Sequence, residues 1–233
     1  SRRSAIYASL NWKHQDVDKF LSSKDWASMP VGNTGKSLWD IKQDDFNFPA
    51  PMDMTNISVN YDTEWLLNYY ETGQVGKVFQ ENVLQAMKTA EPGFSFNFFD
   101  KENETLRNAC TEVTSEDDSD VCNLGSLNFG RIESLSELSD LVELSTKFLI
   151  CGTLKAHLPY EKVHETREKN RRLGLGFMGV HEWLIKRNYK YEVTSELHSW
   201  LSVYKGVSDK VSKEFAEKLS VSTPVANRAI APT

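Results

Sequence analysis

The sequence predicts an α/β fold with largely parallel strands. Segments with the pattern of a strand are each followed by a segment with apolar residues at helical spacing, and this order repeats along the chain. Residues 94–99 (FSFNFF) are too apolar for a half-exposed strand and indicate one buried on both faces, as in a parallel sheet covered by helices. With 39% hydrophobic residues among 233, the chain can bury a sizeable core.

The first predicted unit is a strand that leads into a helix. Residues 4–12 (SAIYASLNW) have a strand-like pattern, and residues 15–22 behind them have apolar positions at helical spacing. Residues 24–51 have no strong period, so we expect an ordered excursion there rather than another unit of the sheet.

The second unit repeats this order. Residues 54–61 (MTNISVNY) alternate like a strand, and Asp62 is a predicted N-cap for the helix that follows, with Gly73 as its stop. Residues 76–93 predict a further helix, which the Pro-Gly pair at its end closes. The buried strand of residues 94–99 comes next.

The second half of the chain continues the alternation after an acidic turn at residues 114–120 (TSEDDSD). Residues 121–132 (VCNLGSLNFGRI) predict a strand, and residues 136–158 predict a long amphipathic helix.

A charged helix or turn is expected next, and the remaining segments again alternate. Residues 171–180 predict a strand running into a helical segment at 181–188, residues 194–219 predict a helix, and residues 225–233 predict a last strand.

Composition narrows the class of protein. The net charge of -6 argues against a surface that coats nucleic acid. No run of eighteen apolar residues and no signal peptide is present, so we expect no membrane and a cytoplasmic location. Three cysteines are too few for a secreted disulfide framework. Without repeats or a low-complexity linker, residues 1–233 are interpreted as a single domain, truncated at both ends.

Two cysteines lie twelve positions apart in the stretch LRNACTEVTSEDDSDVCNLG. In extended backbone, the side chains of Asn108, Cys110 and Glu112 would point to one side, with neighbours about 6 to 7 Å apart. Cys122 could approach from the neighbouring strand, because the acidic turn is long enough to reverse the chain. A thiol, a carboxylate and an amide would then converge on one small site.

Simpler interpretations compete with this one. A lone cysteine in a strand is most often a small buried apolar residue. A structural zinc site lacks support, because the two thiols are twelve apart without a C-x-x-C motif and the nearest histidines are scattered downstream. A disulfide between Cys110 and Cys122 is geometrically possible. The residues alone leave these alternatives undecided.

The longer strings resemble one family. RNACTEV followed by VCNLGSLNFGRI resembles the active-site signature of the ribonucleotide reductase catalytic subunit. SRRSAIYASLNWKH, NRRLGLGFMGVHEWL and RAIAPT resemble three further parts of that family in the right order: the end of its specificity loop, its arginine- and glycine-rich segment, and the approach to its substrate-phosphate loop. The resemblance implies part of a ten-stranded α/β barrel, made of two five-stranded halves, with a central finger loop that carries the radical cysteine.

The resemblance also implies a chemistry for each matching residue. Cys110 would form the thiyl radical that takes hydrogen from C3′ of a ribonucleotide. Glu112 would act as general base on the 3′-hydroxyl, and Asn108 would bind the ribose hydroxyls. The 2′-hydroxyl would leave as water, which yields a 2′-deoxyribonucleotide for DNA synthesis.

Cys122 matches one member of the dithiol pair that supplies the electrons. In the family its partner lies on an earlier strand, which would precede residue 1, and the oxidised pair is reduced again by a thioredoxin- or glutaredoxin-type protein. Cys151 lies on an apolar helical face in sequence and is expected to pack in the core.

Other matches concern nucleotide binding. Arg2 and Arg3 match arginines of the loop that responds to a deoxynucleotide effector, although two arginines before a strand are also typical of a solvated face. Pro232 and Thr233 match the start of the loop that binds the substrate phosphates. The segment GLGFMG lacks the G-x-G-x-x-G spacing, so its glycines are interpreted as permitting close packing.

The radical source and the partners follow from the same resemblance. The short gap between the two motif cysteines favours adenosylcobalamin as cofactor, with a separate metal-containing subunit as the alternative. The remainder of the reductase chain would be a partner, and a homodimer stays open. Two alternatives to an enzyme are a non-catalytic binding or assembly module on the same scaffold and a segment of a split gene.

Overall fold

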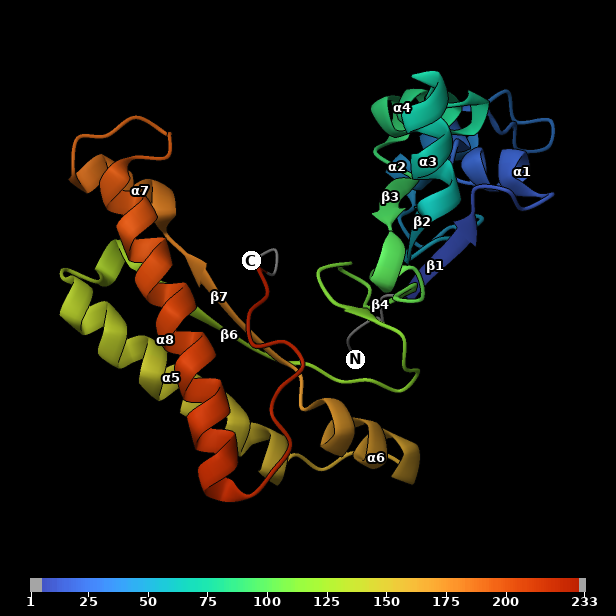
Figure 1. The fold of residues 1–233 in the computed structure, drawn as a ribbon. Helices are drawn as coiled ribbons and strands as arrows, with labels where there is room; N and C mark the ends of the chain where they lie inside the picture. The colour runs from blue at the N-terminus through green and yellow to red at the C-terminus, as the bar shows by residue number, and fades with distance from the viewer. Residues whose placement is uncertain (1–5, 231–233) are drawn as a thin grey trace. The chain divides into compact units, whose positions relative to one another are not determined.

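The structure, a computed structural model, describes residues 6–230 and divides into two compact units (Figure 1). The first unit ends at Glu116 and the second begins at Asp117. Both alternate strands and helices, and the main strand pairs of both are parallel. The predicted α/β class is therefore confirmed.

The first unit contains a three-stranded parallel sheet in the order β1-β2-β3. Its strands are β1 (Ile6–Asn11), β2 (Thr55–Tyr61) and β3 (Gly93–Phe96). Its helices are α1 (Val17–Leu21), α2 (Leu38–Asp44), α3 (Thr63–Thr72) and α4 (Lys77–Thr89), with a short 3-10 helix η1 (Trp26–Ser28) before α2 and another, η2 (Phe99–Lys101), after β3. The strands and helices predicted for residues 4–93 are thus present within the described residues.

Local signals set the ends of these helices. The Asp62 carboxylate accepts a hydrogen bond from the Trp65 backbone N–H at 3.1 Å, and Gly73 ends α3 in the left-handed region with φ of 67°. Both roles were predicted from sequence. In the excursion between α1 and β2, Ser37 and Asp40 form a capping box that starts α2.

The two faces of this sheet differ in chemistry. Ile57, Val59 and Tyr61 point to one side of β2 and are almost fully buried. Val59 and Tyr61 belong to a cluster that includes aromatic side chains of α3 and α4. The opposite side carries Ser9, Ser58, Asn60 and Ser95, as the register of the three strands shows. We call this side the polar face.

The expectation that residues 94–99 form one strand buried on both faces is wrong in part. β3 ends at Phe96, whose side chain is 46% exposed, and Phe99 has left the sheet with φ of 53°. Among the described residues β3 pairs only with β2, so it is an edge strand.

A small antiparallel hairpin follows. It consists of β4 (Leu106–Arg107) and β5 (Thr114–Ser115), in which Leu106 pairs with Ser115 and Arg107 with Thr114. The segment between them, residues 108–113, contains the predicted radical cysteine. We call it the cysteine loop.

The second unit is built on the parallel pair β6 (Asn123–Asn128) and β7 (Leu173–Met178). Its helices are α5 (Leu135–Lys155), α6 (Glu161–Asn170), α7 (Val180–Lys186) and α8 (Ser195–Leu219), with the 3-10 helix η3 (Phe129–Arg131) after β6. Figure 1 shows α5 and α8 side by side. The two strands and the four α-helices match predicted segments, whereas η3 takes the place of the end of the strand predicted for residues 121–132.

Two expectations for the second unit need correction. The predicted strand at residues 225–233 is reduced, within the described residues, to an isolated bridge between Arg228 and Leu175, supported by a bond from the Leu173 N–H to the Ala226 carbonyl at 2.8 Å. Cys151 is exposed rather than packed in the core, because the buried side of α5 is formed by other residues, Leu138, Val142, Leu149 and Ile150 among them.

The described residues form three separate small sheets and no closed barrel. No helix among them is long and apolar enough to cross a membrane.

Candidate active site

The cysteine loop is a compact turn rather than an extended segment. The Thr111 N–H donates to the Asn108 carbonyl at 3.0 Å, and the Val113 N–H donates to the Asn108 side-chain oxygen at 3.2 Å. Thr111 has φ of 68°, which no extended strand residue adopts. The predicted extended backbone at residues 108–112 is therefore wrong, because the Asn108 side chain bonds the local backbone and closes a turn.

The three predicted catalytic side chains on this loop differ in exposure. Cys110 is exposed, and its sulfur forms no disulfide. Asn108 and Glu112 are half-buried, and the Glu112 Oε2 atom is buried without a hydrogen-bond partner among the residues that the structure describes. A buried carboxylate oxygen normally has such a partner, so this atom can accept a donor from outside the chain.

The loop is tied to the polar face of the first sheet. Arg107, the last residue of β4, donates from Nε to Ser95 Oγ at 2.8 Å and from Nη2 to Asn97 Oδ1 at 3.0 Å. From β2, the Asn56 side chain donates to the Ala109 carbonyl. These contacts join the loop to β3 and to β2. No pattern in the sequence indicated either Asn56 or Arg107.

The polar face has further unsatisfied capacity for hydrogen bonds. Asn60 donates to Ser9 Oγ at 3.1 Å, but its Oδ1 atom is buried without a partner within residues 6–230. The hydroxyl of Tyr7, on the same face of β1, is likewise buried without a partner in that range. Such groups suit a site that binds a polar ligand.

Cys122 lies in the second unit, directly before β6, and is partly buried as a thiol. The chain before it is anchored at Asp120, whose carboxylate accepts hydrogen bonds from Arg172 Nε at 2.9 Å and Asn170 Nδ2 at 3.0 Å. The Asp120 and Arg172 side chains are 6% and 13% exposed, so this ion pair is well shielded from solvent.

The acidic turn thus has a structural role in positioning the second thiol. Asp117 pairs with Lys169 at 2.8 Å and Asp118 with Lys162 at 2.6 Å, so both carboxylates are bound to α6. Together with Asp120, they fix the segment that leads into β6. No sequence motif indicated that lysines of α6 would bind these carboxylates.

A glycine of β7 leaves room for the same thiol. A Cβ atom at Gly174 would lie 3.0 Å from Cys122 Sγ, 2.4 Å from a Leu124 methyl group and 3.2 Å from the Ala229 Cβ. A Cβ at Gly176 would lie 2.6 Å from the Ala229 carbonyl oxygen. The interpretation that the glycines of GLGFMG permit close packing is confirmed.

The remaining predicted residues cannot be placed. Arg2, Arg3, Pro232 and Thr233 lie outside the described residues. Within residues 6–230 no group of three or more His, Cys, Asp or Glu side chains is arranged to hold a metal ion.

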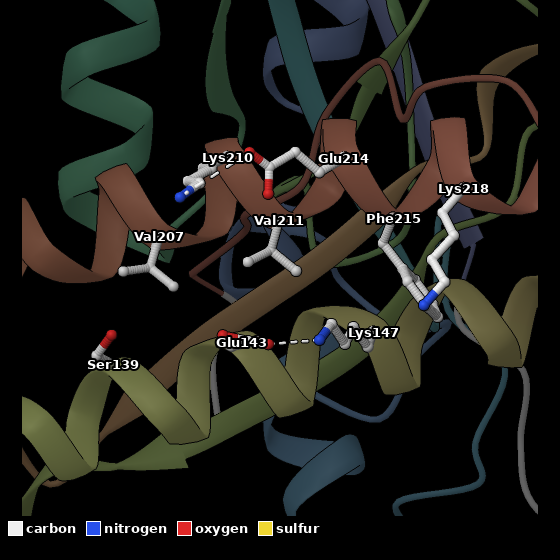
Figure 2. A pocket seen from close by; sticks show the side chains of 9 residues that line it. All are labelled: Ser139, Glu143, Lys147, Val207, Lys210, Val211, Glu214, Phe215 and Lys218. Carbon is white, nitrogen blue, oxygen red and sulfur yellow. Dashed lines mark hydrogen bonds and ion pairs between the residues drawn. The ribbon is translucent and has the colours of Figure 1, made fainter.

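One cavity contains none of the predicted residues. A groove of about 290 Å³ lies between α5 and α8, and Figure 2 shows the side chains that line it. Glu143 pairs with Lys147, and Glu214 Oε1 lies 3.9 Å from Lys210 Nζ. Because both of its glutamates are paired with lysines one helix turn away, the groove has the character of a solvated helix surface.

Comparisons with known proteins bear on this arrangement. The family model described as ribonucleotide reductase, barrel domain, matches residues 52–206, which include Cys110 and Cys122. A protein of Mycobacterium phage D29, provisionally named an adenosylcobalamin-dependent ribonucleoside-triphosphate reductase, is 26% identical over 250 aligned residues that cover 100% of this chain and 33% of that protein. A vitamin B12-dependent ribonucleoside-diphosphate reductase of Thermoplasma acidophilum is 26% identical over 94% of this chain and 30% of its own length.

A solved structure shows the same fold. The alpha subunit of an Actinobacillus ureae class Id ribonucleotide reductase superposes with a TM-score of 0.64 at 18% identity, over 97% of this chain and 45% of that one. The chain therefore spans about a third of the curated relatives it matches and less than half of the matching structure.

Proposed function

Because the chain belongs to the ribonucleotide reductase barrel-domain family, we propose that the protein carrying it reduces ribonucleotides to 2′-deoxyribonucleotides. The observation that supports this most directly is the cysteine loop: an exposed thiol on a turn, tied by two side chains to the polar face of a parallel sheet. An exposed sulfur on an anchored loop can meet both a radical source and a substrate sugar.

Each residue of the site has a proposed role. The Cys110 sulfur, as a thiyl radical, takes the hydrogen atom from C3′ of the ribose. The Glu112 carboxylate receives the proton of the 3′-hydroxyl, for which its buried Oε2 is available. The Asn108 side-chain oxygen already bonds Val113, so its amide nitrogen is the group that donates to a ribose hydroxyl.

The overall step balances with one dithiol. The 2′-hydroxyl leaves as water, the C2′ carbon gains a hydrogen, and two thiols lose two hydrogens to form a disulfide. Cys122 is the proposed member of that pair on this chain, and an external dithiol protein of the thioredoxin or glutaredoxin type returns the disulfide to the reduced state. A diphosphate or a triphosphate substrate fits equally, since the two relatives are named for one each.

We propose adenosylcobalamin as the source of the radical, because both of those relatives are named for a cobalamin cofactor. When bound, this group supplies the carbon radical that removes the hydrogen atom of a thiol. The exposure of Cys110 fits such a reactant, since its sulfur is open to a group outside the chain. A deoxynucleotide effector and a cytoplasmic location complete the proposal.

Replacing the proposed radical thiol tests this function. In the full-length protein, we expect Cys110→Ser to abolish deoxyribonucleotide formation while nucleotide affinity stays within about twofold, because serine cannot form the required radical. Cys151→Ser is the matched control, since Cys151 is also exposed but lies on α5. Turnover is measured with ribonucleoside di- and triphosphates, with and without adenosylcobalamin.

The assay also separates the competing interpretations. Residual multiple turnover in Cys110→Ser removes the radical assignment. A wild-type protein that binds nucleotides but forms no deoxynucleotide, either under these conditions or with a separate metal-containing radical subunit added, supports a non-catalytic module.

A further inference from the structure

The hairpin that carries Cys110 is too small to hold its own shape. Each strand has two residues, so only two residue pairs join β4 to β5. A hairpin of this size is not stable by itself in water. The position of the cysteine loop must therefore come from contacts with the rest of the first unit.

Two side chains that make such contacts act at different points of the hairpin. Arg107 holds the base of the hairpin through Ser95 and Asn97, which are only 1% and 3% exposed. Asn56 acts within the loop itself, since it donates to the carbonyl of Ala109, the residue before Cys110. The contact spans 53 positions of sequence, from the start of β2 to the loop.

The surroundings of Asn56 separate this role from core packing. Asn56 is exposed, whereas its neighbours Thr55 and Ile57 on β2 are buried. Losing its amide group leaves the apolar side of the sheet untouched. By contrast, losing the Arg107 side chain removes one donor from each of two buried polar groups, Ser95 Oγ and Asn97 Oδ1, which destabilises the fold as well.

We propose that Asn56 is a positioning residue: its amide binds the Ala109 carbonyl and thereby fixes the position of the Cys110 sulfur relative to the polar face. The part of this proposal that concerns catalysis rests on the proposed reductase function. The part that concerns loop position does not.

Substitution of Asn56 in the full-length protein tests both parts. Asn56→Asp replaces the donor with a carboxylate that repels the Ala109 carbonyl, and Asn56→Gln keeps an amide donor one methylene further out. For Asn56→Asp we expect backbone amide exchange in residues 108–113 to become about fivefold faster, as for the loss of one hydrogen bond. Turnover should fall at least tenfold, because the loop that carries Cys110 and Glu112 is displaced. Asn56→Gln should lie between Asp and wild type in both measurements.

Asn68→Asp is the matched control, because Asn68 is exposed on α3 of the same unit and undergoes the same change of charge. It should leave loop exchange and turnover at wild-type values. Unchanged amide exchange of the cysteine loop in Asn56→Asp overturns the proposal that Asn56 holds the loop in place. Faster exchange with unchanged turnover overturns the catalytic role. Absence of ribonucleotide reduction in the wild type defeats the proposed function instead. The exchange data then still show whether Asn56 holds the cysteine loop in place.

Discussion

At the scale of single residues, the absence of a side chain at Gly174 shapes the surroundings of a thiol. Three groups from two segments lie within 3.2 Å of where its Cβ would be: the Cys122 sulfur, a Leu124 methyl group and the Ala229 Cβ. The first belongs to the proposed reducing thiol, and the last belongs to the segment that bonds β7. A larger residue must displace at least one of them.

We predict that Gly174→Ala lowers the free energy of unfolding by about 1–3 kcal/mol, the usual cost of overpacking. Gly206→Ala is the control, because Gly206 lies in α8 with nothing within 4 Å of its would-be Cβ. Alanine there should be neutral or stabilise by up to about 1 kcal/mol. Urea unfolding measures both variants, and equal stability of the two would contradict the close approach at Gly174.

At the scale of elements, the start of α3 links a helix cap to the strand before it. The Asp62 carboxylate accepts hydrogen bonds from Trp12 Nε1 at 2.9 Å, Asn11 Nδ2 at 3.1 Å and the Trp65 N–H at 3.1 Å. Burial opposes ionisation of this carboxyl, but these bonds outweigh it and hold the pKa of Asp62 below its ordinary value. One side chain thus joins the ends of β1 and β2 to the first turn of α3.

The sign of the pH dependence follows from that direction. Because the folded pKa lies below the unfolded one, the carboxylate stabilises the fold above the unfolded pKa of about 4 and loses this effect as pH falls through the folded pKa. We predict that Asp62→Ala lowers the free energy of unfolding by about 1–2 kcal/mol at pH 7, and by less at pH 3. Asp140→Ala, at an exposed site on α5, is the control and should change the free energy of unfolding at pH 7 by less than about 0.5 kcal/mol. Urea unfolding at both pH values measures this, and a constant difference for Asp62→Ala would contradict the cap.

Contacts with neighbouring elements also give the acidic turn its role in the fold. In sequence, residues 114–120 look like a solvated connection between two cysteines. In the structure, Asp117 and Asp118 bind lysines of α6, and Asp120 binds Arg172, the residue directly before β7. The turn therefore fixes the entry into β6 and with it the backbone at Cys122.

At the scale of the whole molecule, the two motif cysteines belong to different compact units. Cys110 depends on contacts with β2 and β3, and Cys122 depends on contacts with α6 and β7. The proposed reaction needs both thiols, so it is a property of the assembled protein rather than of either unit.

This division predicts different defects for the two cysteines. We expect Cys122→Ser in the full-length protein to allow at most one aberrant turnover, because the dithiol pair cannot supply two electrons. The measurement is product per active site under excess substrate, with dithiothreitol as reductant and Cys151→Ser as control. Normal multiple turnover of Cys122→Ser with dithiothreitol would exclude it from the reducing pair.

Sequence alone determined the order of the longer strands and helices from β1 to α8, the parallel α/β class, the cap at Asp62 and the stop at Gly73, because these follow from hydrophobic periodicity and from bonds between close neighbours in the chain. It missed the hairpin of β4 and β5 and predicted a last strand that is only a bridge. The family resemblance was also visible in the sequence, because short contiguous stretches of residues carry it. The exposure of Cys151 could not be read from its helix, because two sides of α5 carry apolar residues and only packing selects the one that is buried.

Only the tertiary structure decided the shape and anchoring of the cysteine loop. Alternation in the string N-A-C-T-E predicts an extended segment, but the Asn108 side chain closes a turn, and donors from Asn56 and Arg107 hold that turn on the polar face. The Asn56 contact joins residues 53 positions apart, a distance at which sequence periodicity has no information. A site made of such long-range hydrogen bonds exists only once the sheet has formed.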